Sequence, residues 1–236
     1  MKSDKNLHLI PGYLSHADCE KILDSVRDFQ KRNTLPLIHR NVAGRSLRYF
    51  VIDGDVVHES LPELLDIYRV VEQVVKDYFD PQLTPLRNRA ASVNVNVTPP
   101  GGEYRWHYDR NAVTAILYLN TVSGGETEMY PGYRIHLGRW KNRRAQRWLD
   151  ALLQWSPLLK ASGKRTLVSP AQGLLLMMRG DRCLHSVRRV EGSEDRINIV
   201  MTFDVPQAHF AVEKNLDPYL YSRKPAPSFD PNYKHE

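Results

Sequence analysis

The N-terminal third of the chain has hydrophobic residues at helical spacing. Four of them follow Ser15 with a period of three to four residues, which predicts a helix with Ser15 as its N-cap. These residues are Ile22, Leu23, Val26 and Phe29. A second apolar stripe predicts a helix from about Leu61 to Phe79, and Pro81 and Pro85 end it. The short apolar run before Ser15 predicts a strand and a turn.

From residue 93 onward the hydrophobic period changes to two. In "SVNVNVT" three valines alternate with Asn94, Asn96 and Thr98, so the predicted strand has one apolar and one polar face. An apolar outer face and a polar inner face indicate a barrel or sandwich around a hydrated site. Short strands between glycine and polar turns favour an antiparallel core, either closed or in two sheets. Further strands are predicted at Val113–Asn120, Thr127–Tyr130, Gly173–Met178, Cys183–Val190 and Arg196–Phe203.

One segment between these strands has a helical pattern. Apolar residues from Trp140 to about Leu159 recur at helical spacing, which predicts a helical insertion within residues 132–165 that folds over one end of the barrel. Residues 206–236 hold five prolines and predict an irregular C-terminal tail. We therefore expect one α+β domain over 1–236, with helical support at 1–90 and a β core at 91–205.

Composition adds the class of protein and its compartment. The chain has 236 residues, 42% of them hydrophobic and 25% charged, as in soluble globular proteins. It shows no apolar run long enough for a secretory signal or a membrane span. Its two cysteines, Cys19 and Cys183, cannot build a disulfide framework and suit a reducing environment. We therefore expect a cytoplasmic protein without a membrane partner.

The positive charge is concentrated in the insertion. The net charge is +6, and residues 134–165 contain nine Lys or Arg and one acid, Asp150, which amounts to +8. Subtracting +8 from +6 leaves −2 for the rest of the chain. Two interpretations stay open: an amphipathic lid whose arginines face water, or a surface that binds an anionic substrate or nucleic acid. The sequence leaves the oligomeric state open.

Candidate chemistry begins with His107 and Asp109 in "YRWHYD". Residues i and i+2 of an extended chain share a face, so this imidazole and carboxylate converge and can bind a metal, relay a proton or pair with each other. His185 is a third candidate donor, and two His with one carboxylate suit non-haem Fe(II) and O₂ chemistry. Arg196 opens "RINIVMTF" and shares its face with Asn198. Its planar guanidinium suits the carboxylate of a chelating, dianionic co-substrate.

In this order, His107-x-Asp109, "YLNTVSGGET", His185 and Arg196 resemble the Fe(II)/2-oxoglutarate oxygenases, and among them the prolyl 4-hydroxylase-like group. The resemblance covers about Val93 to Phe203, and the N-terminal "IPGYLSHADCEKIL" is similar to the opening of that group. It implies a double-stranded β-helix (jelly-roll) core with helices packed on one side. It also implies Fe(II) bound by the two His and Asp109, with 2-oxoglutarate and O₂ as co-substrates and ascorbate as an assisting reductant.

Other family positions correspond less evenly. The resemblance assigns Arg196 to the distal carboxylate of 2-oxoglutarate and places Tyr118 and Thr127 beside it, while Gly124 and Gly125 are assigned to a turn. A family tyrosine nine residues before the first His is Thr98 here, and we assign Asn94 and Asn96 to polar contacts in its place. A tryptophan of some prolyl hydroxylases is Thr202, and the insertion has no counterpart. These departures weaken the inference of a peptidyl-proline substrate.

The predicted function is a dioxygenase that hydroxylates, or otherwise oxidises, an unactivated C–H of a small polar substrate such as an amino acid or its derivative. Succinate and CO₂ are the co-products. Asp109, where a halogenase has Gly or Ala, argues against halogenation. The alternatives are an AlkB-like nucleic-acid demethylase, a peptidyl-prolyl hydroxylase, and a non-catalytic metal-binding jelly-roll module.

Four residues are candidates for substrate contact: Trp106, Arg45, Arg48 and Asn198. Trp106 flanks the metal motif and either faces the substrate or packs outward. Arg45 and Arg48 either reach an acidic substrate group over the barrel mouth or are solvated.

Overall fold

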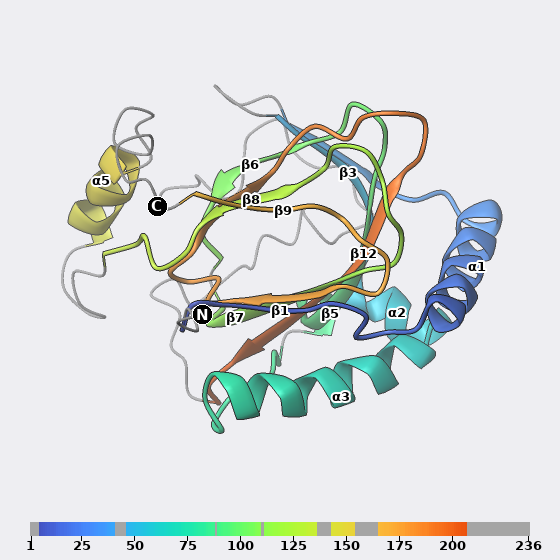
Figure 1. Ribbon diagram of the computed structural model, residues 1–236, viewed down its shortest axis with the longest axis horizontal. Coiled ribbons are helices and arrows are strands. Elements are labelled where there is room, and N and C mark those ends of the chain that lie inside the picture. The colour runs from blue at the N-terminus through green and yellow to red at the C-terminus, as the bar shows by residue number, and fades with distance from the viewer. Residues whose placement is uncertain are drawn as a thin grey trace.

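The computed structural model describes residues 5–40, 46–87, 89–109, 111–135, 143–153 and 165–206. Helices and strands are mixed along these ranges (Figure 1). The helices are α1 (His16–Arg32), α2 (Gly54–Ser60), α3 (Glu63–Tyr78), α4 (Arg89–Ser92) and α5 (Arg143–Leu153). The strands are β1 (Leu7–Ile10), β2 (Leu37–Arg40), β3 (Leu47–Ile52), β4 (Thr84–Pro85), β5 (Val93–Thr98), β6 (Tyr104–His107), β7 (Val113–Tyr118), β8 (Thr127–Tyr130), β9 (Thr166–Val168), β10 (Leu175–Met178), β11 (Leu184–Val187) and β12 (Arg196–Asp204).

The strands form two antiparallel sheets. The large sheet has eight strands in the order β1-β10-β7-β12-β5-β3-β2, with β4 paired to β12. The small sheet has four strands in the order β6-β11-β8-β9. The expected α+β class and antiparallel pairing are therefore confirmed. In the large sheet β12 lies between β5 and β7, which brings together three strands that are distant in sequence.

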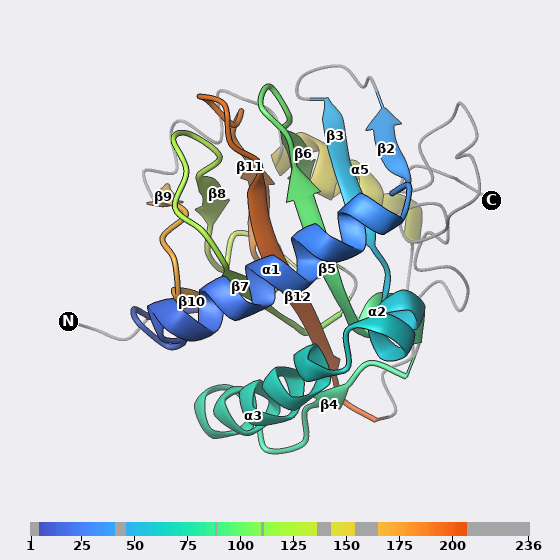
Figure 2. The same ribbon diagram turned by 90° about the vertical axis from the view of Figure 1, so that its right-hand side faces the viewer.

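The two faces of the large sheet have different side chains, as the alternation in "SVNVNVT" predicts. Its outer face is apolar: Val93, Val95 and Val97 are fully buried in one core with residues of α1, α2 and α3. Figure 2 shows α1 lying across β7, β12 and β5 on this face. The inner face, toward the small sheet, is apolar near β10, where Leu176 and Met178 pack, and polar on β5 and β12. The polar part is the region in which the candidate site residues lie.

The two predicted N-terminal helices are present. Ser15 caps α1, since its Oγ accepts a hydrogen bond from Asp18 N at 3.1 Å, and the four predicted apolar residues of α1 are buried. The helix predicted from Leu61 is α3, which begins two residues later because Leu61 ends α2 and Pro62 follows it. Helix α2 was not predicted, although Asp53 caps it by accepting a hydrogen bond from Val56 N at 3.0 Å.

Only part of the predicted insertion belongs to the described residues. Helix α5 lies inside the range expected to be helical and sits at one end of the molecule, opposite α1 (Figures 1 and 2). Residues 136–142, 154–164 and the predicted tail from 207 onward are outside the described residues.

No helix of the described ranges combines the length and apolar character that a membrane span requires.

Candidate metal centre and anion pocket

Three predicted ligands meet between the sheets. His107 ends β6 and His185 lies directly opposite it on β11, because these two residues are paired in the register of the small sheet. Asp109 follows β6 by two residues, and its Oδ1 lies 3.3 Å from His107 Nε2 and 3.5 Å from His185 Nε2. One donor atom from each of the three residues lies within 4.8 Å of the others. This spacing is that of a metal site with three protein ligands.

Hydrogen bonds to the backbone fix the orientation of both imidazoles. His107 Nδ1 lies 3.0 Å from the Arg105 carbonyl oxygen and His185 Nδ1 lies 2.9 Å from the Cys183 carbonyl oxygen. Because a carbonyl only accepts, each Nδ1 must carry the proton, and the Nε2 of a neutral ring is then a free acceptor. Two such nitrogens and a carboxylate oxygen therefore face one point without a donor among them, which fits a divalent cation.

The carboxylate of Asp109 is held by the elements around it. Thr114, on β7, donates from Oγ1 to Asp109 Oδ2 at 2.6 Å, and Asn111 Nδ2 donates to Thr114 Oγ1 at 2.9 Å. Asp109 N donates to the Gly180 carbonyl at 2.9 Å. A Cβ at residue 180 would lie 2.4 Å from Asp109 Oδ2, so only glycine leaves room there. These contacts occupy Oδ2 and leave Oδ1 for the metal.

The pKa values agree with this assignment. Burial alone would raise the pKa of the Asp109 carboxyl, but attraction to the His185 and His107 imidazoles beside it holds that pKa well below its usual range. Burial lowers the pKa of His185, yet the stronger attraction of Asp109 leaves it raised overall. Burial and repulsion by His185 lower the pKa of His107. A proton on His185 therefore competes with a cation for this site.

A buried arginine lies on the facing inner side of β12. Arg196 is 2% exposed, and burial lowers its pKa. Its Nη1 donates to Asn198 Oδ1 at 2.5 Å and its Nη2 to Thr127 Oγ1 at 3.2 Å, while Nε has no hydrogen-bond partner within the described residues. In that part of the chain no carboxylate forms an ion pair with Arg196. A buried guanidinium with neutral partners fits an anionic ligand.

The predicted neighbours of Arg196 surround it. Tyr118 Oη lies 2.6 Å from Thr127 Oγ1, and Arg196 Cζ lies 5.0 Å from the centre of the Tyr118 ring. In the register of the large sheet, Asn198 pairs with Asn96 on one side and with Tyr118 on the other. Tyr118, Thr127, Asn96 and Asn198 are thus brought together with Arg196, and Asn198 lies beside the guanidinium rather than in a separate substrate site.

Two of the predicted substrate contacts lie elsewhere. Trp106 packs outward, on the face of β6 opposite His107, with its ring 5.5 Å from that of Tyr130. Arg48 is exposed and alternates along β3 with the buried Leu47 and Tyr49; its Nη1 donates to the Pro100 carbonyl at 3.3 Å. The structure does not bring either residue to the three ligands. Arg45 lies outside the described residues.

Two tyrosines at the site were not predicted, whereas Asn94 was assigned to polar contacts from its strand phase. The Tyr104 ring lies 4.6 Å from that of His107 and 5.4 Å from that of Tyr49, so two tyrosines form an aromatic wall beside the ligand. Asn94 is 1% exposed, and neither of its side-chain polar atoms has a partner within the described residues. Its strand phase was visible in the sequence, whereas the β3 strand that carries Tyr49 was not predicted.

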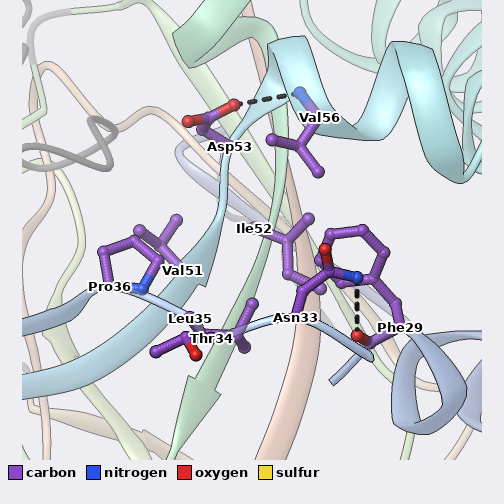
Figure 3. Close-up of a pocket in the computed structure, with 9 residues that line it drawn as sticks. All are labelled: Phe29, Asn33, Thr34, Leu35, Pro36, Val51, Ile52, Asp53 and Val56. Carbon is purple, nitrogen blue, oxygen red and sulfur yellow. Dashed lines mark hydrogen bonds between the residues drawn. The ribbon is translucent and has the colours of Figure 1, made fainter. Parts of the chain in front are cut away.

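A separate cavity lies on the outer side of the molecule. It has a volume of about 210 Å³ and is lined by the C-terminal end of α1, β3 and the start of α2 (Figure 3). Its carboxylate, Asp53, is occupied as the N-cap of α2, and Asn33 donates to the Phe29 carbonyl. Two of its polar side chains are thus engaged in local hydrogen bonds, and the cavity is separate from the three candidate ligands.

Comparison with known proteins shows which solved structures share this fold. No family model and no curated protein matches the sequence. Solved structures do match: a prolyl 4-hydroxylase from Pseudomonas putida is 18% identical, with 84% of this chain and 92% of that one covered and a TM-score of 0.56. The α-ketoglutarate-dependent carbocyclase SnoK of nogalamycin biosynthesis is 13% identical, with 96% and 90% covered and a TM-score of 0.69.

A third similar structure is HygX from Streptomyces hygroscopicus, solved with nickel and 2-oxoglutarate bound. It is 12% identical, with 88% of this chain and 85% of that chain covered and a TM-score of 0.57. At these identities the likeness shows a common fold. The predicted resemblance to prolyl 4-hydroxylases and other 2-oxoglutarate/Fe(II) oxygenases is thereby confirmed at the level of structure.

Proposed function

We propose that the protein is an Fe(II)/2-oxoglutarate-dependent oxygenase. One observation carries the proposal: a three-ligand metal centre faces the same inter-sheet space as a buried arginine that lacks a carboxylate partner within the described residues. The fold shared with solved oxygenases supports it. We further propose that the two sheets are the halves of a jelly roll and that 1–236 is one domain.

Each residue would have a distinct role. His107, Asp109 and His185 would hold Fe(II), and Thr114 would keep the Asp109 carboxylate oriented. Arg196 would bind the distal carboxylate of 2-oxoglutarate, with Tyr118 and Thr127 completing the contact. When bound, Fe(II), 2-oxoglutarate and O₂ supply the oxidation of a C–H bond together with the release of succinate and CO₂.

Polar side-chain atoms on the inner face of β5 support a proposal for the substrate class. Asn94 has both an unpartnered amide donor and an unpartnered acceptor, and Asn96 has an unpartnered oxygen, within the described residues. These atoms favour a small polar substrate, such as an amino acid or its derivative, over a hydrocarbon. Similar folds occur in nogalamycin-biosynthesis enzymes and in a prolyl hydroxylase complexed with a peptide. Two free, buried cysteines are compatible with the expected cytoplasmic location.

The AlkB-like alternative has less support. That family's final-strand motif calls for a second arginine where this chain has Thr202, and Thr202 Oγ1 donates to the Ala91 carbonyl at 2.8 Å. The described residues offer no cation in its place on that row of β12.

The test is succinate formation from 2-oxoglutarate with Fe(II), ascorbate and O₂, with amino acids, proline-containing peptides and methylated oligonucleotides as a panel. We expect turnover that is lost in His107→Ala and Arg196→Ala and retained in Arg69→Ala, whose arginine is exposed on α3. The panel compound that stimulates succinate formation would identify the substrate class. Metal binding without 2-oxoglutarate binding or turnover would instead favour a non-catalytic metal-binding module.

A further inference from the structure

Helix α5 of the insertion is anchored through one side. Arg134 binds Asp150 bidentately, with Nε to Oδ1 at 3.1 Å and Nη2 to Oδ2 at 2.7 Å. Gln146 Nε2 donates to the same carboxylate at 2.9 Å, and Tyr133 Oη donates to the Leu153 carbonyl at 3.1 Å. Positions 146, 150 and 153 follow helical spacing, so one side of α5 is occupied.

This anchor connects α5 to the metal-binding turn. Arg134 Cζ lies 4.7 Å from the ring centre of Tyr108, the residue between the ligands His107 and Asp109. Arg134 Nη1 also donates to the Asp181 carbonyl, next to Gly180. A molecule bound to the other side of α5 would therefore be held at a fixed place near the metal centre.

The other side of α5 carries exposed hydrophobic side chains. Trp148 is 68% exposed and Leu152, one turn later, is 39% exposed. Ile135 is 55% exposed, and its carbonyl accepts a hydrogen bond from Gln146 on α5. Because Gln146 belongs to the anchored side of α5, Ile135 lies beside that side, and we name only Trp148 and Leu152 the insertion patch. Both belong to the seven large hydrophobic residues that are exposed in the described part of the chain, and they lie one turn apart on one side of α5, which suggests a binding surface.

The segment around the insertion patch is strongly basic. Residues 134–165 carry +8, whereas the rest of the chain carries −2. Two of the nine cations, Arg134 and Arg165, form ion pairs within the described part of the chain, with Asp150 and Glu128. Asp150 is the one acidic residue in the sequence of this segment. A helix that exposes a tryptophan and a leucine within a cationic segment has the composition of helices that lie in the headgroup region of a bilayer.

We propose that the insertion patch binds the surface of an anionic lipid bilayer. A nucleic acid would use the cations and stack on Trp148, but it offers little to Leu152, which has no stacking face. A second copy of the chain would bring two +8 segments together and is disfavoured by repulsion. We expected no membrane partner because the sequence has no apolar run long enough to span a membrane. Binding to the surface of a bilayer does not require such a run.

The test is co-sedimentation of the full chain with vesicles of phosphatidylcholine containing 30% phosphatidylglycerol, in 50 mM salt. We expect binding that is absent with pure phosphatidylcholine and falls at least tenfold in 500 mM salt, because the attraction is screened. The double variant Trp148→Ser, Leu152→Ser should bind at least tenfold more weakly. The matched control is Val70→Ser, which removes a 60% exposed hydrophobic side chain from α3 and should leave binding unchanged.

A second measurement does not depend on the folding of the double variant. Tryptophan fluorescence of the unaltered chain should be quenched by vesicles that contain brominated phosphatidylglycerol, and Trp148→Phe should lose at least half of that quenching while still sedimenting with them. Equal sedimentation of the double variant and the unaltered chain would overturn the proposal. So would binding to a single-stranded oligonucleotide without binding to vesicles, which would assign the basic segment to nucleic acid. Neither result depends on the proposed oxygenase activity.

Discussion

The two faces of the large sheet are equally buried but differ in how their side chains are satisfied. On the outer face, Val95, Leu117 and Ile199 are fully buried against apolar neighbours and have no polar side-chain atoms. On the inner face, Asn94 and Arg196 are 1% and 2% exposed but keep polar atoms without partners within the described residues. One face has the composition of a core and the other that of a ligand site.

The difference separates stability from function on a single set of strands. Burial of apolar area contributes about 25 cal/mol per Å², so the outer face stabilises the fold. A buried polar group without a partner costs roughly 1–3 kcal/mol, so the inner face is retained at a cost in stability. Substitutions on the outer face should therefore change unfolding, and substitutions on the inner face should change binding.

The largest effect is expected on the outer face. Phe203 is fully buried, with its ring 5.1 Å from that of Tyr68. Phe203→Ala should lower the free energy of unfolding by about 3–5 kcal/mol, because it removes apolar area and leaves a cavity. Urea unfolding measures this loss, and Ni(II) affinity of the folded variant should stay unchanged. A loss below 1 kcal/mol would mean that the outer face contributes little to the stability of the core.

Arg196→Met should weaken ligand binding without lowering the free energy of unfolding. Two charge-assisted hydrogen bonds of roughly 1.5–3 kcal/mol each would be lost, so the affinity for 2-oxoglutarate should fall by about a hundredfold or more. The free energy of unfolding without ligand should not fall, because a buried charge without a carboxylate partner in the described residues is removed. Isothermal titration and urea unfolding measure the two quantities. A strongly destabilised variant would indicate a structural role for Arg196.

Thr114→Val tests the support of the metal ligand. The substitution keeps the shape of the side chain but removes the donor to Asp109 Oδ2. Ni(II) affinity should fall by about 10–100-fold, the usual cost of losing an outer-shell partner. Thr84→Val on β4, where Oγ1 donates to the Asp204 carbonyl, is the matched control and should bind Ni(II) normally. Equal affinities of the two variants would contradict the assigned role.

Metal affinity should rise with pH. The pKa of His185 is raised in the metal-free fold, mainly by Asp109 acting against burial, so a proton competes with the metal below that pKa. Affinity should fall by up to about tenfold per pH unit below the raised pKa and level off above it. The attraction between protonated His185 and Asp109 also stabilises the metal-free fold. This contribution is fully present below the pKa of about 6.5 that a histidine has in the unfolded chain, and it is lost as pH rises through the raised pKa of His185 in the folded protein. Ni(II) titrations from pH 6 to 8.5 check the sign, and a flat profile would contradict it.

The smallest expected effect is at Asn94. Asn94→Leu has a similar size and removes two unpartnered polar atoms, so the free energy of unfolding should rise by about 1 kcal/mol. Thermal or urea unfolding of the ligand-free protein measures it. Loss of stability in this variant would mean that Asn94 has a structural partner such as a bound water.

The sequence predicted the elements whose pattern is local. Helices α1 and α3, the two faces of β5 and the convergence of His107 with Asp109 all follow from periods of 3.6 or 2. The pairing of β12 between β5 and β7 joins residues about 100 positions apart and has no local pattern. The contact of Arg134 with Asp150 spans 16 residues and likewise follows no helical or strand period.

Tyr104 shows why strict alternation fails at the site. Counting back from His107 in steps of two would place Tyr104 with Trp106, on the face away from the metal centre. The register between β11 and β6 shifts between His185 and Val187, so that Tyr104 pairs with Val187 and its ring reaches His107. A bulge of this kind depends on how the strands pair in the folded protein, and the residue pattern of "YRWH" does not predict it.

The most direct test of the central claim is an isothermal titration of 2-oxoglutarate into the protein, with and without Ni(II), a redox-inert substitute for Fe(II). We predict binding that requires the metal, is abolished in Asp109→Ala and is weakened at least a hundredfold in Arg196→Met. Binding of equal strength in the Arg196 variant, or no binding to the metal-loaded protein, would contradict the assignment of the inter-sheet site to Fe(II) and 2-oxoglutarate.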